Sequence, residues 1–488
     1  MSDPSRTQAV RRLSELLRTT LLGAALMALL FASACGGDDA GGASSGGQAG
    51  AAGGGSGGTG ASVGSGGAFT GGSAGAGGSA ASAAAGGSAG AGGSSGSAGA
   101  AGGGGTGGQI ETADYYVSPS GSDSDPGTID KPFKTFAKAT AVANPGQLIY
   151  LRGGIYKETV KLTKSGSSGN PIRWHGYPGE AAIIEGPGRT TSLDTALTIN
   201  GSWLSVRDLT VRKSARAGIL IFGDEVHLQR IVSHGNGRVG INFYHAKNGS
   251  LTDCATFDNY DKYDSDGSLS HGQDADGFAA SGSTGVVVKR CLAFNNADDG
   301  FDFWEASNSS VEDSYAFGNG VNRWGDSAFE GNGNGFKMGG PGSTNNLVQR
   351  CLAFDHPMRG FVDNAAVSSN FYNNTSISNK VGFQSGSSTN TWANNVGFQN
   401  ANDRPSSWSG ASESNTWDLS INVQSSHFAS LKRPAPTGAE SLDAMLALFE
   451  KSDFALPASG SPLVDAGKKL SGVSYTGSAP DLGGRERP

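Results

Sequence analysis

Residues 287–302 read Val-Val-Lys-Arg-Cys-Leu-Ala-Phe-Asn-Asn-Ala-Asp-Asp-Gly-Phe-Asp, and the pattern of this stretch recurs along the chain. Each copy opens with a short alternation of apolar and polar residues typical of a strand, at 227–231, 250–254, 287–291, 310–314 and 347–351. Five residues after each of these segments stands a polar side chain of similar kind: Asn236, Asn259, Asn296, Asn319 and His356. This regularity predicts a ladder of side-chain amides at a repeated turn.

A glycine followed by Ile or Phe marks the next element of each repeat. These glycines are Gly218, Gly240, Gly277, Gly300, Gly335, Gly360 and Gly382. A coil of 22 to 23 residues therefore repeats, with insertions of 14 and 12 residues in two of the coils. The period predicts an all-β parallel β-helix, a solenoid in which each coil places three short strands on the strands of the previous coil.

The endpoints of the five strand-like segments form one column, which we expect to point inward. Its members are Ile231, Cys254, Cys291, Ser314 and Cys351. A free thiol in such a place is a small apolar filler. Because three cysteines cannot all pair with one another, the column also argues against a disulfide framework.

The β-helix is predicted to occupy residues 109–400. Its N-terminal end begins with a strand from Tyr115 and a short capping helix near residues 135–143. Residues 401–488 are predicted to be an irregular extension that covers the end of the β-helix. Within it, residues 441–451 have the helical spacing of Leu and Phe, and we expect this helix to cover the open C-terminal edge, which would otherwise invite aggregation.

Residues 1–34 have the order of an export signal: arginines, an apolar run over residues 21–31, then Ala-Ser-Ala before Cys35. A cysteine at this place is typical of a bacterial lipoprotein, in which Cys35 is lipidated and anchors the mature protein to a membrane. Ordinary secretion is the alternative. Residues 35–108 are almost wholly Gly, Ala and Ser, which predicts a disordered tether.

The formal net charge of −7 disfavours a nucleic-acid partner. From the export signal we expect either an outer-membrane or cell-surface lipoprotein or a secreted protein. We also expect the protein to be a monomer.

The repeat also fixes which polar side chains stack on one another. The residue before each glycine forms one column, in which Asp276 is followed by Asp299, and the residue two after the glycine forms another, in which Asp302 is followed by Lys337. Successive coils lie about 4.8 Å apart. With Asp298, four carboxylates thus converge beside one lysine. Such an oxygen-only cluster suits Ca²⁺, whereas the alternative is that the aspartates simply populate solvent-facing turns.

The two insertions, residues 260–275 and 320–333, leave the same corner on the coils before and after the one with Asp298, Asp299 and Asp302. We expect them to form two walls of a cleft with the carboxylates on its floor. Their aromatic residues either bind sugar or pack the loops. Next to a divalent cation the pKa of Lys337 would fall toward working pH, so this lysine could act as a base.

Three motifs, Ala275-Asp-Gly-Phe278, Asn296-Ala-Asp-Asp-Gly-Phe-Asp302 and Gly333-Asn-Gly-Phe-Lys337, resemble those of the family-nine polysaccharide lyases, which are right-handed parallel β-helix pectate lyases. The resemblance covers about residues 114–400. It implies that the calcium ligands are Asp276, Asp298, Asp299 and Asp302. It also implies that Lys337 is the base in a β-elimination on polygalacturonate, an acidic polysaccharide. Asp274 remains an alternative to Asp276 as a ligand.

Two arginines are candidates for binding uronate groups next to the cleaved bond: Arg359, one coil beyond Asn334, and Arg323 in the second insertion. Two other functions remain open. Paired aspartates also serve inverting β-helix glycoside hydrolases. A tethered solenoid could also be a non-catalytic, calcium-dependent glycan-binding adhesin.

Overall fold

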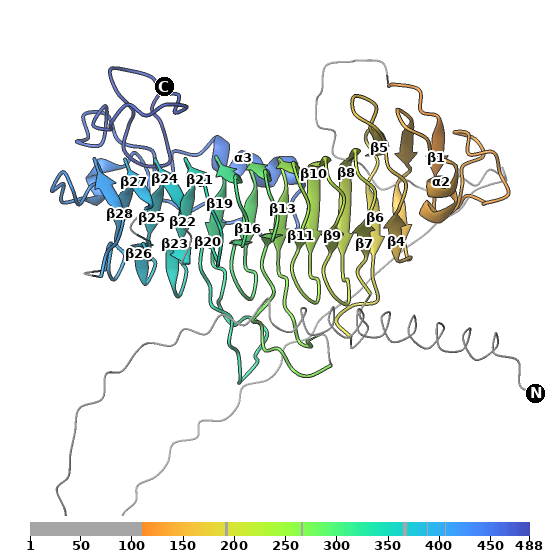
Figure 1. The fold of residues 1–488 in the computed structure, drawn as a ribbon, viewed down its shortest axis with the longest axis horizontal. Helices are drawn as coiled ribbons and strands as arrows, with labels where there is room; N and C mark the ends of the chain where they lie inside the picture. The colour runs from red at the N-terminus through yellow and green to blue at the C-terminus, as the bar shows by residue number, and fades with distance from the viewer. Residues whose placement is uncertain (1–109, 191–193, 265–266, 365–367, 388, 406) are drawn as a thin grey trace, which may run out of the picture. The chain divides into compact units, whose positions relative to one another are not determined.

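Short parallel strands wind into stacked coils along most of the chain (Figure 1). The computed structural model describes residues 110–190, 194–264, 267–364, 368–387, 389–405 and 407–488. The proposed signal over residues 1–34, Cys35 and the tether over residues 35–108 lie outside the described residues. Within the described part, no helix has both the length and the apolar character needed to cross a membrane.

The strands form two sheets, and every strand pairs in parallel with those of the neighbouring coils. Sheet B contains β4 (Val160–Leu162), β7 (Leu197–Ile199), β9 (Ile219–Ile221), β11 (Ile241–Tyr244), β14 (Phe278–Ser281), β17 (Phe301–Trp304), β20 (Phe336–Gly339), β23 (Arg359–Asn364) and β26 (Val381–Gln384). Sheet A contains β1 (Tyr115–Val117), β2 (Leu148–Leu151), β3 (Gly154–Tyr156), β5 (Ile172–Gly176), β6 (Ala182–Glu185), β8 (Leu204–Arg212), β10 (Val226–His234), β12 (Ser250–Thr252), β13 (Ala255–Phe257), β15 (Val287–Lys289), β16 (Leu292–Phe294), β18 (Ser310–Glu312), β19 (Tyr315–Phe317), β21 (Asn346–Gln349), β22 (Leu352–Phe354), β24 (Ser369–Tyr372), β25 (Thr375–Ile377), β27 (Thr391–Ala393), β28 (Val396–Phe398) and β29 (Ala411–Glu413).

Sheet A bends once in every coil, so each coil has three sides. The bend residue adopts a left-handed backbone conformation with φ between 50° and 60°, as in Arg230 and Asp253. Its side chain alternates in charge from coil to coil: Asp208, Arg230, Asp253, Arg290, Asp313 and Arg350. Neighbouring members pair, with Arg290 Nε 2.7 Å from Asp253 and Arg350 Nε 2.6 Å from Asp313. The bend thus carries a ladder of opposite charges.

The interior is filled by stacked rings and by the cysteine column. Five phenylalanines of sheet B stack with ring centroids 4.7 to 5.1 Å apart: Phe278, Phe301, Phe336, Phe361 and Phe383. The column from Ile231 to Cys351 is fully buried, and Cys254, Cys291 and Cys351 are free thiols, as expected. The prediction of an all-β parallel β-helix is therefore confirmed.

The predicted amide ladder runs through the corner between the two sheets. The side-chain amide of Asn236 donates to Asn259 at 2.9 Å, and the next two steps, to Asn296 and Asn319, have the same geometry. Each side-chain oxygen also accepts the backbone N–H of the previous coil, so buried polar groups are satisfied in pairs. The prediction of the ladder is confirmed.

Replacing Asn236 with alanine is expected to lower the free energy of unfolding by about 1–3 kcal/mol. The change removes the acceptor of the buried N–H of Ser214, which lies 3.0 Å from the Asn236 side-chain oxygen. Urea unfolding followed by circular dichroism measures the effect. The exposed Gln229→Ala on the same coil is the control, and equal stability of the two variants would contradict the role of the ladder.

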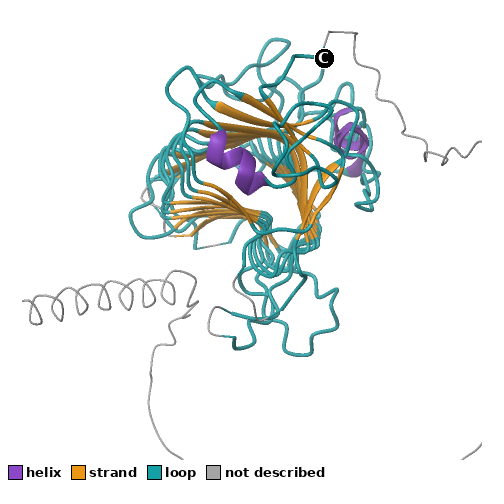
Figure 2. Ribbon diagram, turned by 90° about the vertical axis from the view of Figure 1, so that its right-hand side faces the viewer, coloured by secondary structure: helices purple, strands orange, loops and turns teal. Residues whose placement is uncertain are grey.

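The N-terminal end is closed by helix α2 (Phe136–Val142), which lies across the end of the coils in Figure 2. Thr135 caps the helix by accepting from the N–H of Lys138, and Phe136 stacks on Trp174 at 5.8 Å. The predicted capping helix is confirmed. At the other end, Trp408 and Trp417 pack against the core, and β29 pairs with β27.

Helix α3 (Leu442–Glu450) lies along the side of the β-helix, so the expectation that it covers the C-terminal edge is wrong (Figure 1). Its buried residues, among them Met445 and Phe449, pack on a second stack of rings that points outward from sheet A: Phe257, Phe294, Phe317 and Phe354. An outward apolar stripe of this kind needs a cover, and the helix provides it. A 3-10 helix, η1 (Ser425–His427), precedes α3.

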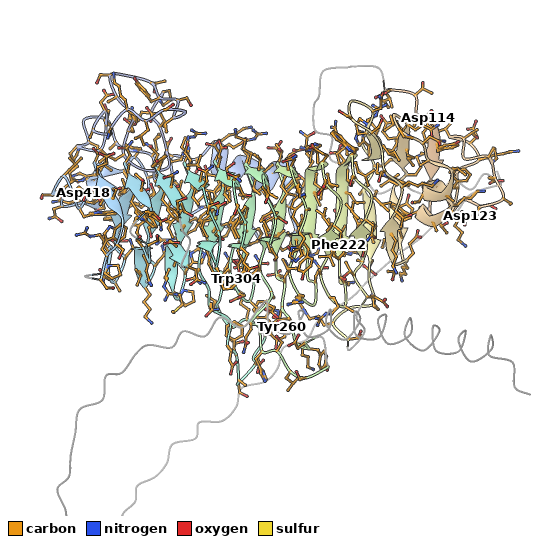
Figure 3. All side chains as sticks on the ribbon, in the orientation of Figure 1. Asp114, Asp123, Phe222, Tyr260, Trp304 and Asp418 are labelled. Atoms are coloured by element: carbon orange, nitrogen blue, oxygen red, sulfur yellow. The ribbon has the colours of Figure 1, made fainter. Side chains whose placement is uncertain are left out.

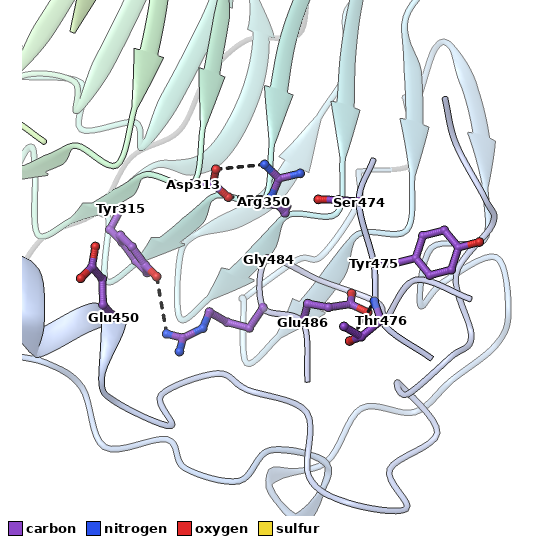
Figure 4. A pocket seen from close by; sticks show the side chains of 10 residues that line it. Asp313, Tyr315, Arg350, Glu450, Ser474, Tyr475, Thr476, Gly484 and Glu486 are labelled. Carbon is purple, nitrogen blue, oxygen red and sulfur yellow. Dashed lines mark hydrogen bonds and ion pairs between the residues drawn. The ribbon is translucent and has the colours of Figure 1, made fainter. Parts of the chain in front are cut away.

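The C-terminal segment beyond α3 leaves a cavity of about 440 Å³ against the coils (Figure 4). Arg485 donates to the carbonyl oxygen of Phe449 at 3.0 Å, at the C-terminal end of α3, and Arg350 pairs with Asp313. Arg485 thus joins the C-terminal segment to α3, whereas the ion pair of Arg350 and Asp313 lies within the coils.

Candidate metal and base site

The two insertions form a single lobe, defined by residues 260–275 and 320–333, rather than two walls. The ring of Tyr260 stacks on Trp324 at 4.8 Å, and the Tyr260 hydroxyl donates to Asp326 at 2.7 Å. His271 Nδ1 lies 2.8 Å from the same carboxylate. The expectation of a cleft between two loops is therefore wrong, because the two loops bury their aromatic residues against each other. Figure 3 shows Tyr260 in this lobe, below the coils.

The hydrogen bonds at the lobe also set the charge of Asp326. The bonds from Tyr260 and His271 lower the pKa of Asp326 to about 2. Asp326 is thus an anion at neutral pH, and it joins the first insertion to the second. The aromatic residues of the lobe serve packing, which was one of the two roles predicted for them.

Backbone pairing places the polar columns as the repeat predicts. Asp302 lies directly opposite Lys337 on the neighbouring strand. Asp299 follows Asp276 by one coil, and its N–H donates to Asp276 Oδ1 at 3.1 Å. The strands β14, β17 and β20 therefore present the site on three successive coils.

Three carboxylates come together at this corner. Oxygen atoms of Asp276, Asp298 and Asp299 all lie within 4.8 Å of one another, and the three residues are buried. Asp302 lies to the side of this group, where Lys337 Nζ donates to its Oδ2 at 3.3 Å. The structure thus divides the four predicted ligands into a group of three and one carboxylate paired with the lysine.

The end of the second insertion and the residue that follows it hold two of these carboxylates in place. The backbone N–H of Asn332 donates to Asp298 at 2.6 Å. Asn334 donates to Asp299 Oδ1 with its backbone N–H at 2.7 Å and its side-chain amide at 2.8 Å. None of these three hydrogen bonds was predicted. The contact of Asn334 with Asp299 could have been predicted, because the two residues stand in the same column of the repeat.

Two buried carboxylate oxygens at this corner accept no hydrogen bond: Asp302 Oδ1, and Asp299 Oδ2, which Lys337 Nζ approaches to 3.2 Å. A buried anionic oxygen without a donor is costly unless a cation compensates it. Two such oxygens beside a group of three buried carboxylates fit a hard divalent cation that prefers oxygen ligands. The residues present are therefore suited to hold Ca²⁺.

The raised pKa values of the carboxylates also favour a site that holds a cation. Burial, followed by the charges of Asp302 and Asp299, raises the pKa of Asp276 well above its usual range. Burial and the charge of Asp299 do the same for the pKa of Asp298. Burial also raises the pKa of Asp302 to about 6, against the opposing effect of the Lys337 ammonium. The cluster therefore resists full ionisation unless positive charge is supplied.

Lys337 supplies part of that charge. Its Nζ lies 3.2 Å from Asp299 Oδ2 as well as 3.3 Å from Asp302 Oδ2. Burial opposes the charge of this lysine, but the surrounding carboxylates, Asp302 first, outweigh burial and raise the pKa of Lys337 well above its usual range. With the carboxylates alone around it, Lys337 is an ammonium group.

Three other residues named from the sequence lie around the cluster. Asp274 pairs with Arg238 at 2.9 Å and is not in the group of three, so the geometry favours Asp276 as the ligand. Arg359 lies one coil beyond the site, with its Nη1 3.5 Å from the side-chain oxygen of Asn334. Arg323 is exposed beside Gly318 and Asn295, on the sheet A side of the corner, and the structure does not bring it to the carboxylates.

The raised pKa of Asp302 gives stability a pH dependence of defined sign. The folded chain holds this proton more tightly than the unfolded chain, so Asp302 costs stability as the pH rises from about 4 to above 6. In the presence of a chelator, we expect Asp302→Asn to melt at the wild-type temperature near pH 4 and at a higher temperature above pH 6. Melting curves by circular dichroism check this, and a variant that is less stable at both pH values would contradict it.

Comparison with known proteins agrees with this fold. The profile of a family described as Pel9A-like, right handed beta helix region, matches residues 115–402. Pectate lyase PEL9 of Emericella nidulans is 32% identical over 391 residues, which cover 71% of this chain and 93% of that protein. Pectate lyase L of Dickeya chrysanthemi is 32% identical over 397 residues, which cover 76% of this chain and 90% of that protein.

Solved structures give the same result. The crystal structure of pectate lyase Pel9A superimposes with a TM-score of 0.68 at 29% identity and covers 78% of this chain and 98% of its own. A rhamnogalacturonan lyase at 23% identity and a TM-score of 0.56 shares the fold, covering 69% of this chain and 98% of its own. This chain therefore belongs to the Pel9A-like family of right-handed parallel β-helix proteins, the family-nine polysaccharide lyases that its motifs resemble.

Proposed function

We propose that this protein is a calcium-dependent pectate lyase that cleaves polygalacturonate by β-elimination, with Lys337 as the base. The observation that carries the proposal is the position of Lys337, one coil beyond Asp302 and beside a buried group of three carboxylates. The similarity to pectate lyase PEL9 and pectate lyase L supports the same substrate class.

In this mechanism the carboxylates of Asp276, Asp298 and Asp299, together with Asp302, hold Ca²⁺. The bound cation would supply the positive charge that neutralises these anions and the uronate carboxylate of the substrate. Once the carboxylates are neutralised, they no longer raise the pKa of Lys337, and burial then favours its neutral amine. The charge state that a base requires thus follows from the surroundings of the lysine.

Lys337 then takes the proton from C5 of the sugar that follows the cleaved bond. The electron pair of the C5–H bond forms the C4–C5 double bond, and the C4–O bond breaks. The departing glycosidic oxygen takes up a proton from water. Lys337 loses its gained proton to solvent, so atoms and charge balance over one turnover.

An absorbance assay on a panel of uronans tests the proposal. We expect polygalacturonate to give an unsaturated, ultraviolet-absorbing product, and a chelator to abolish the reaction until Ca²⁺ is restored. New reducing ends without absorbance would instead identify a glycoside hydrolase. Binding without either product would identify an adhesin.

We also propose that residues 1–34 direct export and that Cys35 is lipidated, so that the catalytic domain works as a monomer at the cell surface. The support is the order of arginines, apolar residues and small residues before Cys35. Labelling with a fatty-acid analogue should mark the wild type but not Cys35→Ser. A protein that is labelled in neither form, and is recovered from the medium, would indicate ordinary secretion.

A further inference from the structure

Two aromatic side chains lie side by side on the outer face of sheet B, away from the carboxylate cluster. Phe222 follows β9, Tyr244 ends β11, and their ring centroids are 5.7 Å apart in an edge-to-face arrangement. The interior positions beside them are filled by Ile221 and Phe243, which are fully buried. Phe222 itself is 37% exposed (Figure 3), so core packing does not require these two rings.

The pair belongs to the same face as the catalytic column. From β9 to β20 in sheet B, the outward positions are the first and the third after the Ile or Phe that follows the glycine, as the strand pairing shows. The first position carries Asp302 and Lys337, and the third carries Phe222, Tyr244 and Trp304. Aromatic side chains thus lie beside the catalytic column on the coils of β9, β11 and β17, with Ser281 of β14 between Tyr244 and Trp304.

The site itself defines the direction in which a polymeric substrate crosses this face. Asp302 and Lys337 lie on neighbouring coils, so the line from the carboxylates to the base runs along the β-helix axis. A chain that engages both continues over β14, β11 and β9 in one direction. Three coil steps, about 14 Å, separate β17 from β9. A sugar chain extended from the site therefore reaches Phe222 and Tyr244 within a few residues.

The surface between the pair and the carboxylates carries short outward side chains. Asn242 and Ser281 are half-buried, whereas Ala279 is buried in a small apolar cluster with Ala217 and Val239. Helix α3 packs against sheet A rather than this face. Sugar rings have apolar C–H faces that stack on aromatic rings, whereas their hydroxyl edges bind amides and hydroxyls. This arrangement offers both kinds of partner.

We propose that Phe222 and Tyr244 form a distal sugar-binding subsite, which holds residues of the acidic polysaccharide several sugars away from the cleaved bond. The inference rests on the proposed function, because the position of the cleaved bond is taken from Lys337 and the carboxylates. The pair adds affinity for long chains and takes no part in bond cleavage. Its contribution is therefore expected in KM and to depend on substrate length.

The test compares wild type with Phe222→Ala/Tyr244→Ala on polygalacturonate and on trigalacturonate, a chain too short to span both places. We expect a roughly three- to tenfold rise in KM for the polymer, with kcat unchanged, and no change for the short chain. Tyr475→Ala, which removes a ring with the same exposure of 37% on the C-terminal segment, is the control. Phe222→Leu/Tyr244→Leu, which keeps apolar bulk, should match the alanine variant, whereas Tyr244→Phe should match wild type.

A binding measurement separates failure of this inference from failure of the proposed function. Calorimetry with polygalacturonate compares Lys337→Ala with the triple variant Phe222→Ala/Tyr244→Ala/Lys337→Ala, so the result does not depend on turnover. Equal affinities would overturn the subsite even if wild type is an active lyase. A loss of affinity would support it even if the reaction is not elimination. A wild-type dimer that the Phe222→Ala/Tyr244→Ala change dissociates would also overturn it, because the rings would then be an interface between copies.

Discussion

Lys337→Ala is expected to lower the elimination rate on polygalacturonate by about 100- to 10,000-fold, the range typical for loss of a positioned base. The lysine is the only basic group that the described residues place within hydrogen-bond distance of Asp299 and Asp302. Its removal also leaves the carboxylates without their ammonium partner, so Ca²⁺ should raise the melting temperature of the variant by more than it raises that of wild type. Initial rates by absorbance and melting curves at several Ca²⁺ concentrations measure both effects.

The control for this variant is Lys161→Ala. Lys161 stands in the same outward column of sheet B, on β4, far from the carboxylates along the stack. It should keep the wild-type rate. If Lys337→Ala also keeps it, Lys337 is not the base, and a smaller response of the variant to Ca²⁺ would speak against its contact with the cation-binding carboxylates.

Asp299→Asn is expected to have opposite effects with and without Ca²⁺. The change removes a fully buried charge from the centre of the group while keeping its shape. In chelator the variant should melt at a higher temperature than wild type, because repulsion among buried carboxylates is relieved. Its affinity for Ca²⁺ should fall at least by the roughly 10- to 100-fold that loss of even an outer partner of a metal ligand costs. Activity at limiting Ca²⁺ should fall with it.

Calorimetric titration with Ca²⁺ and melting in chelator provide the two readouts. Asp253→Asn is the control, since Asp253 is a charged bend residue that pairs with Arg290 on another corner of the coils. It should bind Ca²⁺ as wild type does. An Asp299→Asn variant with unchanged affinity would show that the cation, if any, binds elsewhere.

The arrangement of Asp302 opposite Lys337 could be predicted from sequence because the spacing of coils is fixed by backbone hydrogen bonds. Once the repeat length is known, two residues at the same place in successive repeats must be neighbours. The amide ladder and the buried cysteines followed for the same reason. These features depend on the period alone and not on the conformation of any loop.

The lobe and helix α3 could not be placed in this way. An insertion leaves the periodic geometry, so the repeat does not indicate whether Tyr260 stacks on Trp324 or lines a cleft. The spacing of α3 reveals an apolar face but not its partner. The outward stack of rings could have been predicted from the sequence. Each of its members Phe294, Phe317 and Phe354 stands three residues after an inward residue of the cysteine column, and side chains alternate along a strand, so the rings face outward.

The charge ladder at the bend of sheet A strengthens the coupling between neighbouring coils. The carboxylates at another corner weaken it. The stability of a solenoid is close to a sum of the energies of single coils and of couplings between nearest neighbours. At the bend, neighbouring coils present opposite charges, as in Asp313 and Arg350. At the step from Asp276 to Asp299, they present like charges. This junction weakens the coupling between two neighbouring coils, and the Ca²⁺ proposed to bind there would strengthen it.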